Sequence, residues 1–275
     1  MDFLLGVHRA LDFIEIPYLQ YLATESIGFR RESLAECSSA KVKIHTLNIS
    51  KFCYISKYPM KAYNHEKAII SLTTWKARIN TAGLTLFSLI KKCPGFHIVL
   101  VLSEDEFPEK EKELPDTIMA FVNQDLVELL WVKRNYKAFK KVIFTIEKYK
   151  GIPVISADDD CLYTCNYAER LYERWLQTRA DVVRYTPRTK QITQGPCTLY
   201  CLSPTLVQEF ISSLTDEQIK ASQDDNVFSK FLIKKGIKIT TSVNSKTLPF
   251  VFHNDNKPLT KGQRNKACYA QCFWY

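Results

Sequence analysis

A short apolar run that ends in three consecutive aspartates constrains the fold of this chain more than any other feature. Residues 152–157 are apolar apart from one serine, and Gly151 and the acidic group Asp158, Asp159 and Asp160 bound them. A run of this length predicts a buried strand. Because ligands of open α/β sheets bind at the carboxyl ends of the strands, the aspartates are expected at a ligand-binding edge.

The chemistry of adjacent carboxylates narrows what this edge can bind. Three neighbouring carboxylates repel one another unless a cation or hydrogen-bond donors compensate their charge. Their hard oxygen atoms suit Mg²⁺ or Mn²⁺, and such ions are usually shared with the phosphates of a substrate. The alternative is a solvated acidic turn, because aspartate is common in turns.

Strand-like and helix-like segments alternate along the chain after an irregular stretch, residues 1–65. The expected strands are residues 67–73, 96–102, 127–132, 152–157, 181–185 and 237–241. The expected helices are residues 81–92, 135–148, 167–177 and a segment that begins at Asp224 or Asp225 and ends before Gly236. Residues 104–115 are expected to be a surface loop with a short helix, and residues 186–203 to be rich in loops. This order predicts an α/β domain whose central sheet is mixed and mostly parallel and is flanked by helices.

Two common nucleotide-binding motifs are missing from the sequence. There is no G-x-G-x-x-G after the first strand and no G-x4-G-K-[ST] anywhere in the chain. A bound nucleotide would therefore be held through a metal ion and side chains.

The charge of the chain favours anionic partners. The net charge is +9 and the isoelectric point is about 9.0. A nucleic-acid-binding face would need basic residues clustered with stacking or base-reading groups. Lysine and arginine are instead spread along the chain, as on a solvated basic surface, so no nucleic-acid partner is expected.

The cysteines and the N-terminal residues indicate where in the cell the protein is expected. The 9 cysteines include three pairs with i, i+4 spacing, but none has the spacing of a zinc-binding C-x2-C pair. Free thiols in a reducing cytosol are the expectation. The N-terminus has none of the features of a signal peptide, and no window approaches the roughly 20 apolar residues of a membrane span. The expected location is cytoplasmic.

Three segments together resemble a known family. Residues 68–79 (AIISLTTWKARI), residues 137–141 (KAFKK) and residues 154–160 (VISADDD) look like the corresponding parts of bacterial sugar-nucleotide-dependent glycosyltransferases with the GT-A fold. The aspartates match the DXD motif of that fold. The resemblance covers residues 66–255 and implies a GT-A-like, Rossmann-like single domain, with the nucleotide-binding half up to about residue 160 and the acceptor half after it. Residues 1–65 would be a partly helical extension, and residues 256–275 a basic and aromatic tail.

The resemblance implies a role for each matching residue. The segment from Thr73 to Arg78 would line the nucleotide pocket, and Arg78, Lys137 and Lys141 would offset the charge of the diphosphate. Asp158 and Asp159 would contact the donor. Asp160, with Asp158, would hold Mn²⁺ or Mg²⁺ against the two phosphates. Members of this fold often supply a late histidine to the metal, which here would be His253, although a lone histidine is more often a surface or hydrogen-bonded residue.

Asp224 and Asp225 have two interpretations. The resemblance implies that one of them lies near the acceptor hydroxyl, where in an inverting transferase it would act as general base. Either could also be the N-cap of the helix that follows. Our hypothesis is that Asp225 is the base and Asp224 the cap.

The expected function is transfer of a sugar from a nucleoside-diphosphate donor to a glycan or lipid-linked acceptor, of the cell-surface polysaccharide or lipopolysaccharide type. One alternative is a sugar-nucleotide nucleotidyltransferase, which would carry a glycine-rich basic loop where residues 73–78 have no glycine. Another is a basic nucleic-acid-binding protein, which would leave the aspartates unexplained. Cations and aromatic residues in 261–275 suit peripheral contact with an anionic membrane at its inner face, or else a disordered or oligomer-packing tail.

Overall fold

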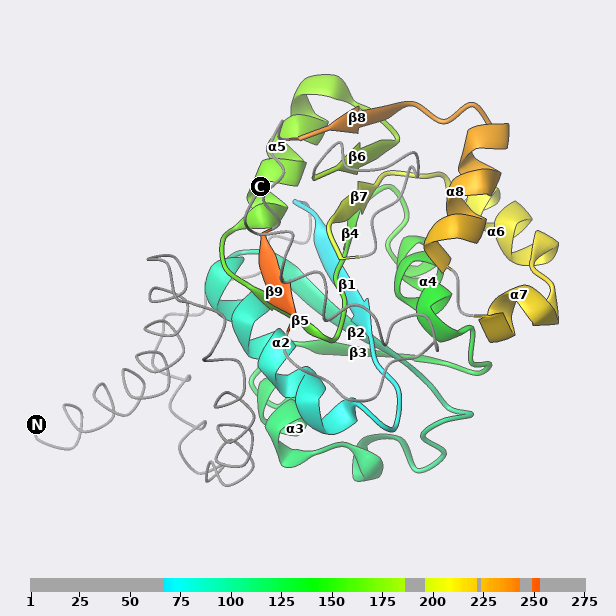
Figure 1. Cartoon of the computed structure of the whole chain (residues 1–275). Helices are drawn as coiled ribbons and strands as arrows, with labels where there is room; N and C mark the ends of the chain where they lie inside the picture. The colour runs from blue at the N-terminus through cyan, green and yellow to red at the C-terminus, as the bar shows by residue number, and fades with distance from the viewer. Residues whose placement is uncertain (1–66, 186–195, 222–223, 243–248, 253–275) are drawn as a thin grey trace, which may run out of the picture. The chain divides into compact units, whose positions relative to one another are not determined.

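A seven-stranded sheet forms the centre of the domain (Figure 1). The structure is a computed structural model that describes residues 67–185, 196–221, 224–242 and 249–252, all within the unit formed by residues 59–275. In sheet order, the strands are β3 (Glu128–Val132), β2 (His97–Ser103), β1 (Ile69–Thr73), β4 (Val154–Ser156), β7 (Thr198–Tyr200), β6 (Val182–Arg184) and β8 (Ile239–Thr241).

The direction of the strands brings their carboxyl ends to one edge. Strands β3, β2, β1 and β4 are parallel to one another, and β6 is parallel to β8. Strand β7 lies between β4 and β6 and is antiparallel to both. Six strands therefore end at the same edge, which we call the carboxyl edge, while β7 begins there. The prediction of a mixed, mostly parallel α/β sheet is confirmed.

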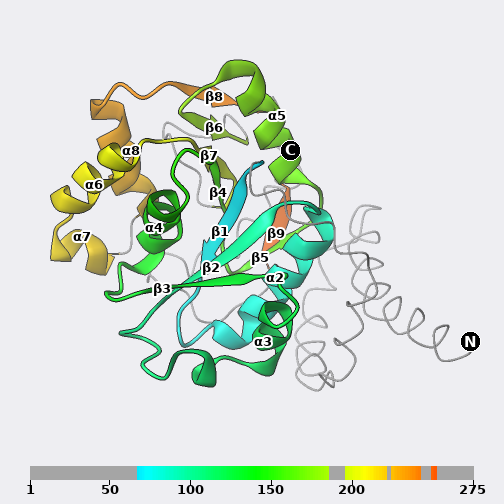
Figure 2. The same ribbon diagram turned by 180° about the vertical axis from the view of Figure 1, so that it is seen from behind.

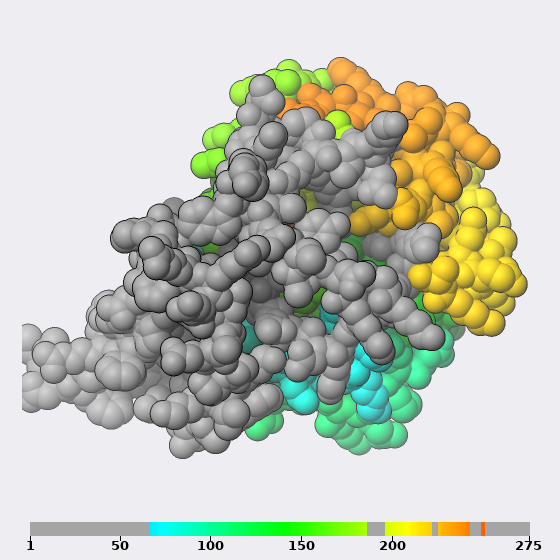
Figure 3. Space-filling view, viewed as in Figure 1, coloured from blue at the N-terminus to red at the C-terminus, as the bar shows by residue number. Residues whose placement is uncertain are grey.

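Helices cover both faces of the sheet. Every residue of β1 and β2 is buried, as expected for parallel strands packed on two sides. Helices α2, α3 and α5 lie on one side and α4, α6, α7 and α8 on the other (Figures 1 and 2). Their bounds are α2 Ile79–Lys92, α3 Asp116–Val122, α4 Lys140–Lys148, α5 Tyr167–Thr178, α6 Pro204–Ser213, α7 Asp216–Ala221 and α8 Asp224–Lys234. Residues of α6, α7 and α8 gather at one margin of the space-filling view (Figure 3).

A second, two-stranded sheet follows the aspartates directly. Strand β5 (Cys161–Tyr163) pairs antiparallel with β9 (Phe250–Phe252), so that Cys161 lies opposite Phe252. The sequence did not predict either strand, because each depends on pairing with a segment far away in sequence, which local pattern does not encode. The short strand β7 was missed for the same reason, and its position after Gly195 and Pro196 favoured a loop.

Helix boundaries differ from the predictions in two places. The segment expected to be one helix over residues 135–148 begins with a 3₁₀ turn, Lys137–Phe139, and becomes α-helical at Lys140. The Asn135 side chain causes this entry, because its Oδ1 accepts a hydrogen bond of 2.8 Å from the backbone N–H of Lys137, which has a positive φ of 52°. The 3₁₀ turn Lys110–Glu113 lies in the region expected to be a surface loop with a short helix, whereas helix α3, which begins just after that region, was not predicted.

Several predictions fall on residues outside those described. They are the extension of residues 1–65, the tail of residues 256–275 and the position of His253.

Within the described ranges, none of the helices combines the length and the apolar character needed to cross a membrane. The five cysteines in these ranges are free thiols, and burial raises the pKa of Cys161 and Cys197 well above the usual value.

Candidate active site

The three aspartates lie at the carboxyl edge, in the turn between β4 and β5. The β4 pairing extends one residue further, because the N–H of Ala157 donates to the carbonyl of Ser71 in β1 at 2.9 Å. The N–H of Asp158 then donates to the Tyr163 hydroxyl at 3.1 Å, and that hydroxyl donates to the carbonyl of Pro196 at 3.1 Å. These bonds fix the backbone where the acidic turn begins.

Asp159 points into the protein and holds the turn in place. Its side chain is only 7% exposed, and its carboxylate accepts hydrogen bonds from Thr74 Oγ1 at 2.6 Å and from Arg78 Nη1 at 2.7 Å. Its carbonyl accepts a further bond from the Thr85 hydroxyl at 2.9 Å. Burial raises the pKa of Asp159, and the contacts with Arg78 and Thr74 oppose that shift. The Asp159 side chain, which was expected to contact the donor, therefore makes structural contacts inside the protein.

Asp158 and Asp160 are the more exposed members of the group, with side chains 28% and 21% exposed. Lys141 Nζ lies 2.6 Å from Asp158 Oδ1, and Arg78 Nη2 lies 3.3 Å from Asp160 Oδ2. Within this turn, two carboxylates therefore lie near solvent, and the one between them in sequence is buried.

The two cations come from the beginnings of helices that follow strands. Arg78 is the N-cap residue of α2, after β1, and Lys141 lies in the first turn of α4, after β3. Helix α4 is fixed against β1 by Ser71, whose hydroxyl donates to the Lys141 carbonyl at 2.5 Å and lies 2.8 Å from Thr145 Oγ1. Both helices therefore begin at the carboxyl edge, where the positive end of a helix favours an anion.

The other lysines near this edge have different surroundings. Lys140 is 1% exposed, and its Nζ lies 3.3 Å from Glu106 Oε2 and 3.2 Å from Asn135 Oδ1. Burial lowers the pKa of Lys140. Lys137, expected to act on the diphosphate, lies in the 3₁₀ turn with a partly exposed side chain. Of the lysines at the start of this segment, Lys141 is the one that the structure shows on an aspartate of the motif.

Thr73 lies at the end of β1, as expected, but its hydroxyl faces another strand. Thr73 Oγ1 donates to the carbonyl of Val101 in β2 at 2.6 Å. The residue is 9% exposed. The observed bond is structural, and the expected contact of Thr73 with a donor stays a prediction.

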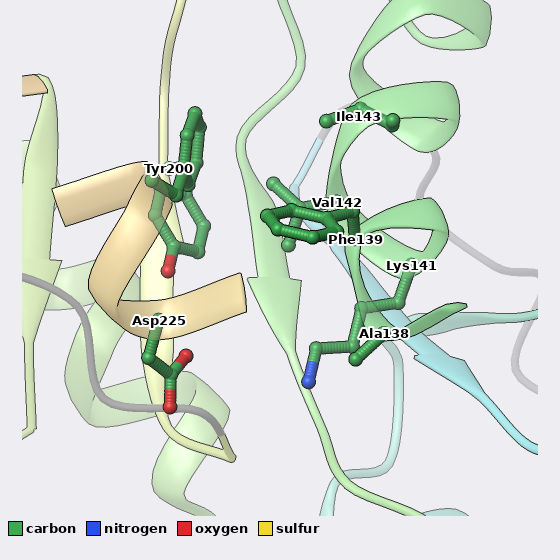
Figure 4. A pocket seen from close by; sticks show the side chains of 8 residues that line it. Ala138, Phe139, Lys141, Val142, Ile143, Tyr200 and Asp225 are labelled. Atoms are coloured by element: carbon green, nitrogen blue, oxygen red, sulfur yellow. The ribbon is translucent and has the colours of Figure 1, made fainter. Parts of the chain in front are cut away.

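Asp225 and Lys141 line the same small pocket. Figure 4 shows Asp225 at the start of α8 and Lys141 on α4 on opposite sides of the pocket. The lining is otherwise largely apolar and consists of Ala138, Phe139, Val142, Ile143, Tyr200 and Phe228. Lys141 belongs to this pocket and also contacts Asp158. The structure therefore brings Asp225 and the acidic turn, which are far apart in sequence, to the same lysine.

The donor atoms at this edge fit a hard divalent cation that is completed by a substrate. Mg²⁺ in proteins is usually held by one or two carboxylates together with phosphates and water, and Asp158 and Asp160 supply two partly exposed carboxylates. Among the side chains that the structure describes, no three His, Cys, Asp or Glu form a group that could hold a metal. Further ligands would come from a nucleotide, from water or from residues such as His253.

Comparisons of sequence find no match, whereas comparisons of structure find proteins of similar fold. No protein-family model and no curated protein matches the chain. The S. aureus TarS structure with UDP-GlcNAc matches with a TM-score of 0.50 and 14% identity, over 71% of this chain and 61% of that one. A cytidylyltransferase from Leptospira borgpetersenii has a TM-score of 0.48 and 12% identity, over 75% and 88%. The mannosyltransferase PcManGT from Pyrobaculum calidifontis, in complex with GDP-Man and Mn²⁺, has a TM-score of 0.44 and 13% identity, over 69% and 61%.

The fold is GT-A-like. The likeness to TarS, together with the mixed seven-stranded sheet and its flanking helices, supports this assignment. At 14% identity the likeness shows the fold alone, and the chain spans about three fifths of the length of that TarS structure. Proteins with this fold carry out different reactions, so the function has to be argued from the site.

Proposed function

We propose that this protein is a metal-dependent glycosyltransferase that moves a sugar from a nucleoside-diphosphate donor to a hydroxyl of a glycan or lipid-linked acceptor. The observation that carries the proposal is the arrangement at the carboxyl edge. Two partly exposed carboxylates, Asp158 and Asp160, lie beside Arg78 and Lys141, and Lys141 shares a pocket with Asp225. These are the groups needed to bind a diphosphate and to accept a proton.

The charge of the leaving group explains why these residue types are needed. Breaking the bond between the sugar and the phosphate leaves a nucleoside diphosphate with growing negative charge. A Mn²⁺ or Mg²⁺ ion held by Asp158 and Asp160 would neutralise part of that charge. Lys141, Lys137 and the beginning of α4 would stabilise the rest, and this helps catalysis to the extent that the interaction is stronger in the transition state than in the ground state.

His253 is our candidate for a further metal ligand. It follows Phe252, whose backbone lies opposite Cys161, the residue next to Asp160. Replacing His253 with alanine should weaken Mn²⁺ binding less than replacing Asp160, because one neutral ligand is lost and no charge.

Asp225 is our candidate for the general base. Its position in the first turn of α8 also suits a helix-capping or helix-dipole role. The pocket favours the catalytic role, because Asp225 faces apolar walls and Lys141 there, and not only its own helix. Asp224, its neighbour in the same turn, is the better candidate for the cap.

The alternative of a nucleotidyltransferase fits the fold but has less support at this site. Such an enzyme would be expected to surround a triphosphate with a glycine-rich loop after β1. Here the turn after β1 has no glycine, and Thr74 and Arg78 in it are both bonded to Asp159. The turn after β1 therefore holds the acidic turn in place through Thr74 and Arg78.

The proposal can be tested with a thermal-shift panel of nucleoside diphosphates, with and without Mn²⁺. We expect one base to stabilise the protein strongly, and only when Mn²⁺ is present. Asp160→Asn should lose this stabilisation while keeping the melting temperature of the ligand-free protein. Stabilisation by a nucleoside triphosphate with release of pyrophosphate would support the nucleotidyltransferase instead. Salt-dependent DNA binding without any response to nucleotides would favour the nucleic-acid-binding protein.

A further inference from the structure

Lys140, the first residue of α4, is a lysine whose charge is enclosed by protein. Its side chain is 2% exposed, and its Nζ lies 3.3 Å from Glu106 Oε2 and 3.2 Å from Asn135 Oδ1. Glu106 follows β2 and Asn135 follows β3, so both partners lie at the carboxyl edge. Lys140 therefore joins three segments that begin at this edge.

The partners of Lys140 also hold the entry of α4. The Oδ1 atom of Asn135 accepts hydrogen bonds from the N–H of Lys137 as well as from the Lys140 ammonium. The N–H of Asn135 donates to Asp105 Oδ2 at 2.9 Å, next to Glu106 in sequence. The Lys140 ammonium thus connects the segment after β2 to the 3₁₀ turn that leads into the helix.

This connection determines where the next residue points. Lys141 places its Nζ 2.6 Å from Asp158 Oδ1. Neighbouring side chains of a helix point about 100° apart around its axis, because a turn has 3.6 residues. Holding the Lys140 side chain between Glu106 and Asn135 therefore fixes the rotation of α4 at its beginning, and with it the direction of the Lys141 side chain.

A buried ammonium is a costly way to hold a helix. Burial lowers the pKa of Lys140, and the charge of Glu106 opposes that shift. The contacts of 3.3 and 3.2 Å are longer than the roughly 2.7–2.9 Å of strong charge-assisted hydrogen bonds. Buried ion pairs can often be replaced by apolar residues without loss of stability. Stability alone therefore does not explain why this position carries a charge, whereas a role in orienting a ligand-binding group does.

We propose that Lys140 is a positioning residue for donor binding, which orients the beginning of α4 so that the Lys141 ammonium faces the diphosphate. This inference rests on the proposed function. It gives two lysines that are adjacent in sequence different tasks, one inside the protein and one at the ligand. Because Lys140 acts through Lys141, removing both should weaken donor binding no more than removing Lys141 alone.

The test is a double-mutant cycle on Lys140→Met, which keeps the apolar stem and removes the charge, and Lys141→Gln. The probe is whichever of UDP, GDP, ADP and CDP stabilises the parent protein with Mn²⁺, and its affinity is measured by calorimetry. Lys148→Met is the matched control, because Lys148 lies at the other end of α4 and pairs with Glu128.

We expect a loss of affinity that is not additive. Lys140→Met should bind the nucleoside diphosphate about tenfold more weakly, the equivalent of about 1.4 kcal/mol. Lys141→Gln should also bind it more weakly, and the double variant should match Lys141→Gln, since the two effects share one contact. Lys148→Met should keep the affinity of the parent protein. A role of Lys140 in stability alone would change the melting temperature without this coupling to Lys141.

Other results would overturn the inference in distinguishable ways. Unchanged affinity in Lys140→Met, or losses that add in the double variant, contradicts the positioning role and leaves the proposed function intact. A parent protein that binds none of the four nucleotides with Mn²⁺ contradicts both. If Lys140→Met does not fold, Lys140→Met combined with Glu106→Gln provides the same test, since it leaves no carboxylate without its cation.

Discussion

The two ends of the central sheet each carry a cluster of carboxylates and cations, and the clusters differ in their balance. At the amino end, Glu128 begins β3 and accepts hydrogen bonds from His97 Nε2 at 2.6 Å and from the Tyr149 hydroxyl at 2.5 Å. Lys148 also binds its carboxylate. At the carboxyl edge, three aspartates share two cations, Arg78 and Lys141, among the contacts described above.

The charge of the amino-end cluster is balanced without a ligand, whereas the cluster at the carboxyl edge can accept one. The hydrogen bond from His97 is the main cause that lowers the pKa of Glu128 to about 2, so this carboxylate is well compensated without any ligand. At the other edge, the carboxylates of Asp158 and Asp160 lie beside Lys141 and Arg78 and are still partly exposed. We infer that the amino-end cluster stabilises the fold, whereas the carboxyl edge is suited to bind a further cation together with an anion.

The largest expected effect is on sugar transfer at the carboxyl edge. Asp225→Asn should keep donor binding and thermal stability, because asparagine caps a helix about as well as aspartate but cannot act as a base. Transfer should fall by about 10²–10⁴-fold, the usual contribution of a general base. The measurement is initial rates at saturating donor.

Asp224→Asn serves as the matched control for Asp225, because it makes the same change one residue earlier in the same helical turn. It should transfer sugar at the parent rate. If only the control loses activity, the two roles are reversed. If both variants remain fully active, the base lies elsewhere or the reaction proceeds with retention and needs none.

The next effect concerns stability at the same edge. Asp159→Ala removes the buried partner of Arg78 and should lower the free energy of unfolding by about 3 kcal/mol, the low end of the range for breaking a buried pair. The low end is expected because Asp160 still lies 3.3 Å from Arg78. Urea denaturation measures the change. Asp158→Ala, at a more exposed carboxylate, should cost far less, and equal losses would show that Asp159 does not anchor the turn.

The sequence predicted the parallel half of this domain well because its pattern is strong there. Strands β1 and β2 are continuous apolar runs, and the acidic turn after β4 was found for the same reason. Strands β5, β7 and β9 have three residues each and depend on partners distant in sequence, such as Phe252 opposite Cys161. Their formation is decided by tertiary pairing, which local pattern does not encode.

The type of a candidate site residue was easier to predict than its orientation. The aspartates were singled out by their chemistry and Lys141 by the family resemblance, but nothing local indicated that Asp159 turns inward to Thr74 and Arg78. The role of Ser71 in fixing α4 over β1 was also missed, since a serine within an apolar strand does not reveal its partner.

The pH dependence of stability should report the amino-end cluster. The folded pKa of Glu128 is about 2, below its ordinary value of 4.5. Its stabilising contribution is therefore fully present above about pH 4.5 and is lost as the pH falls toward 2. Glu128→Gln should lose less stability than the parent protein over this window, and nucleotide binding at pH 7 should not change. Parallel pH profiles of the melting temperatures would contradict this role.

The smallest expected effect distinguishes the two roles considered for Thr73. Thr73→Val keeps the shape of the side chain but removes the hydroxyl that donates to the Val101 carbonyl at 2.6 Å. A buried carbonyl that loses its donor costs about 1–3 kcal/mol, so urea denaturation should show a loss in this range. If the hydroxyl serves only this bond, the affinity for nucleoside diphosphate with Mn²⁺ will be unchanged. A clear loss of affinity would instead show that Thr73 also contacts the donor.

Thr178→Val is the control, because its hydroxyl donates to the Arg174 carbonyl at 2.8 Å near the end of α5, away from the carboxyl edge. An unchanged affinity would show that a hydroxyl at the carboxyl edge can serve the fold alone, as Glu128 does at the amino end, beside residues that we propose bind the donor.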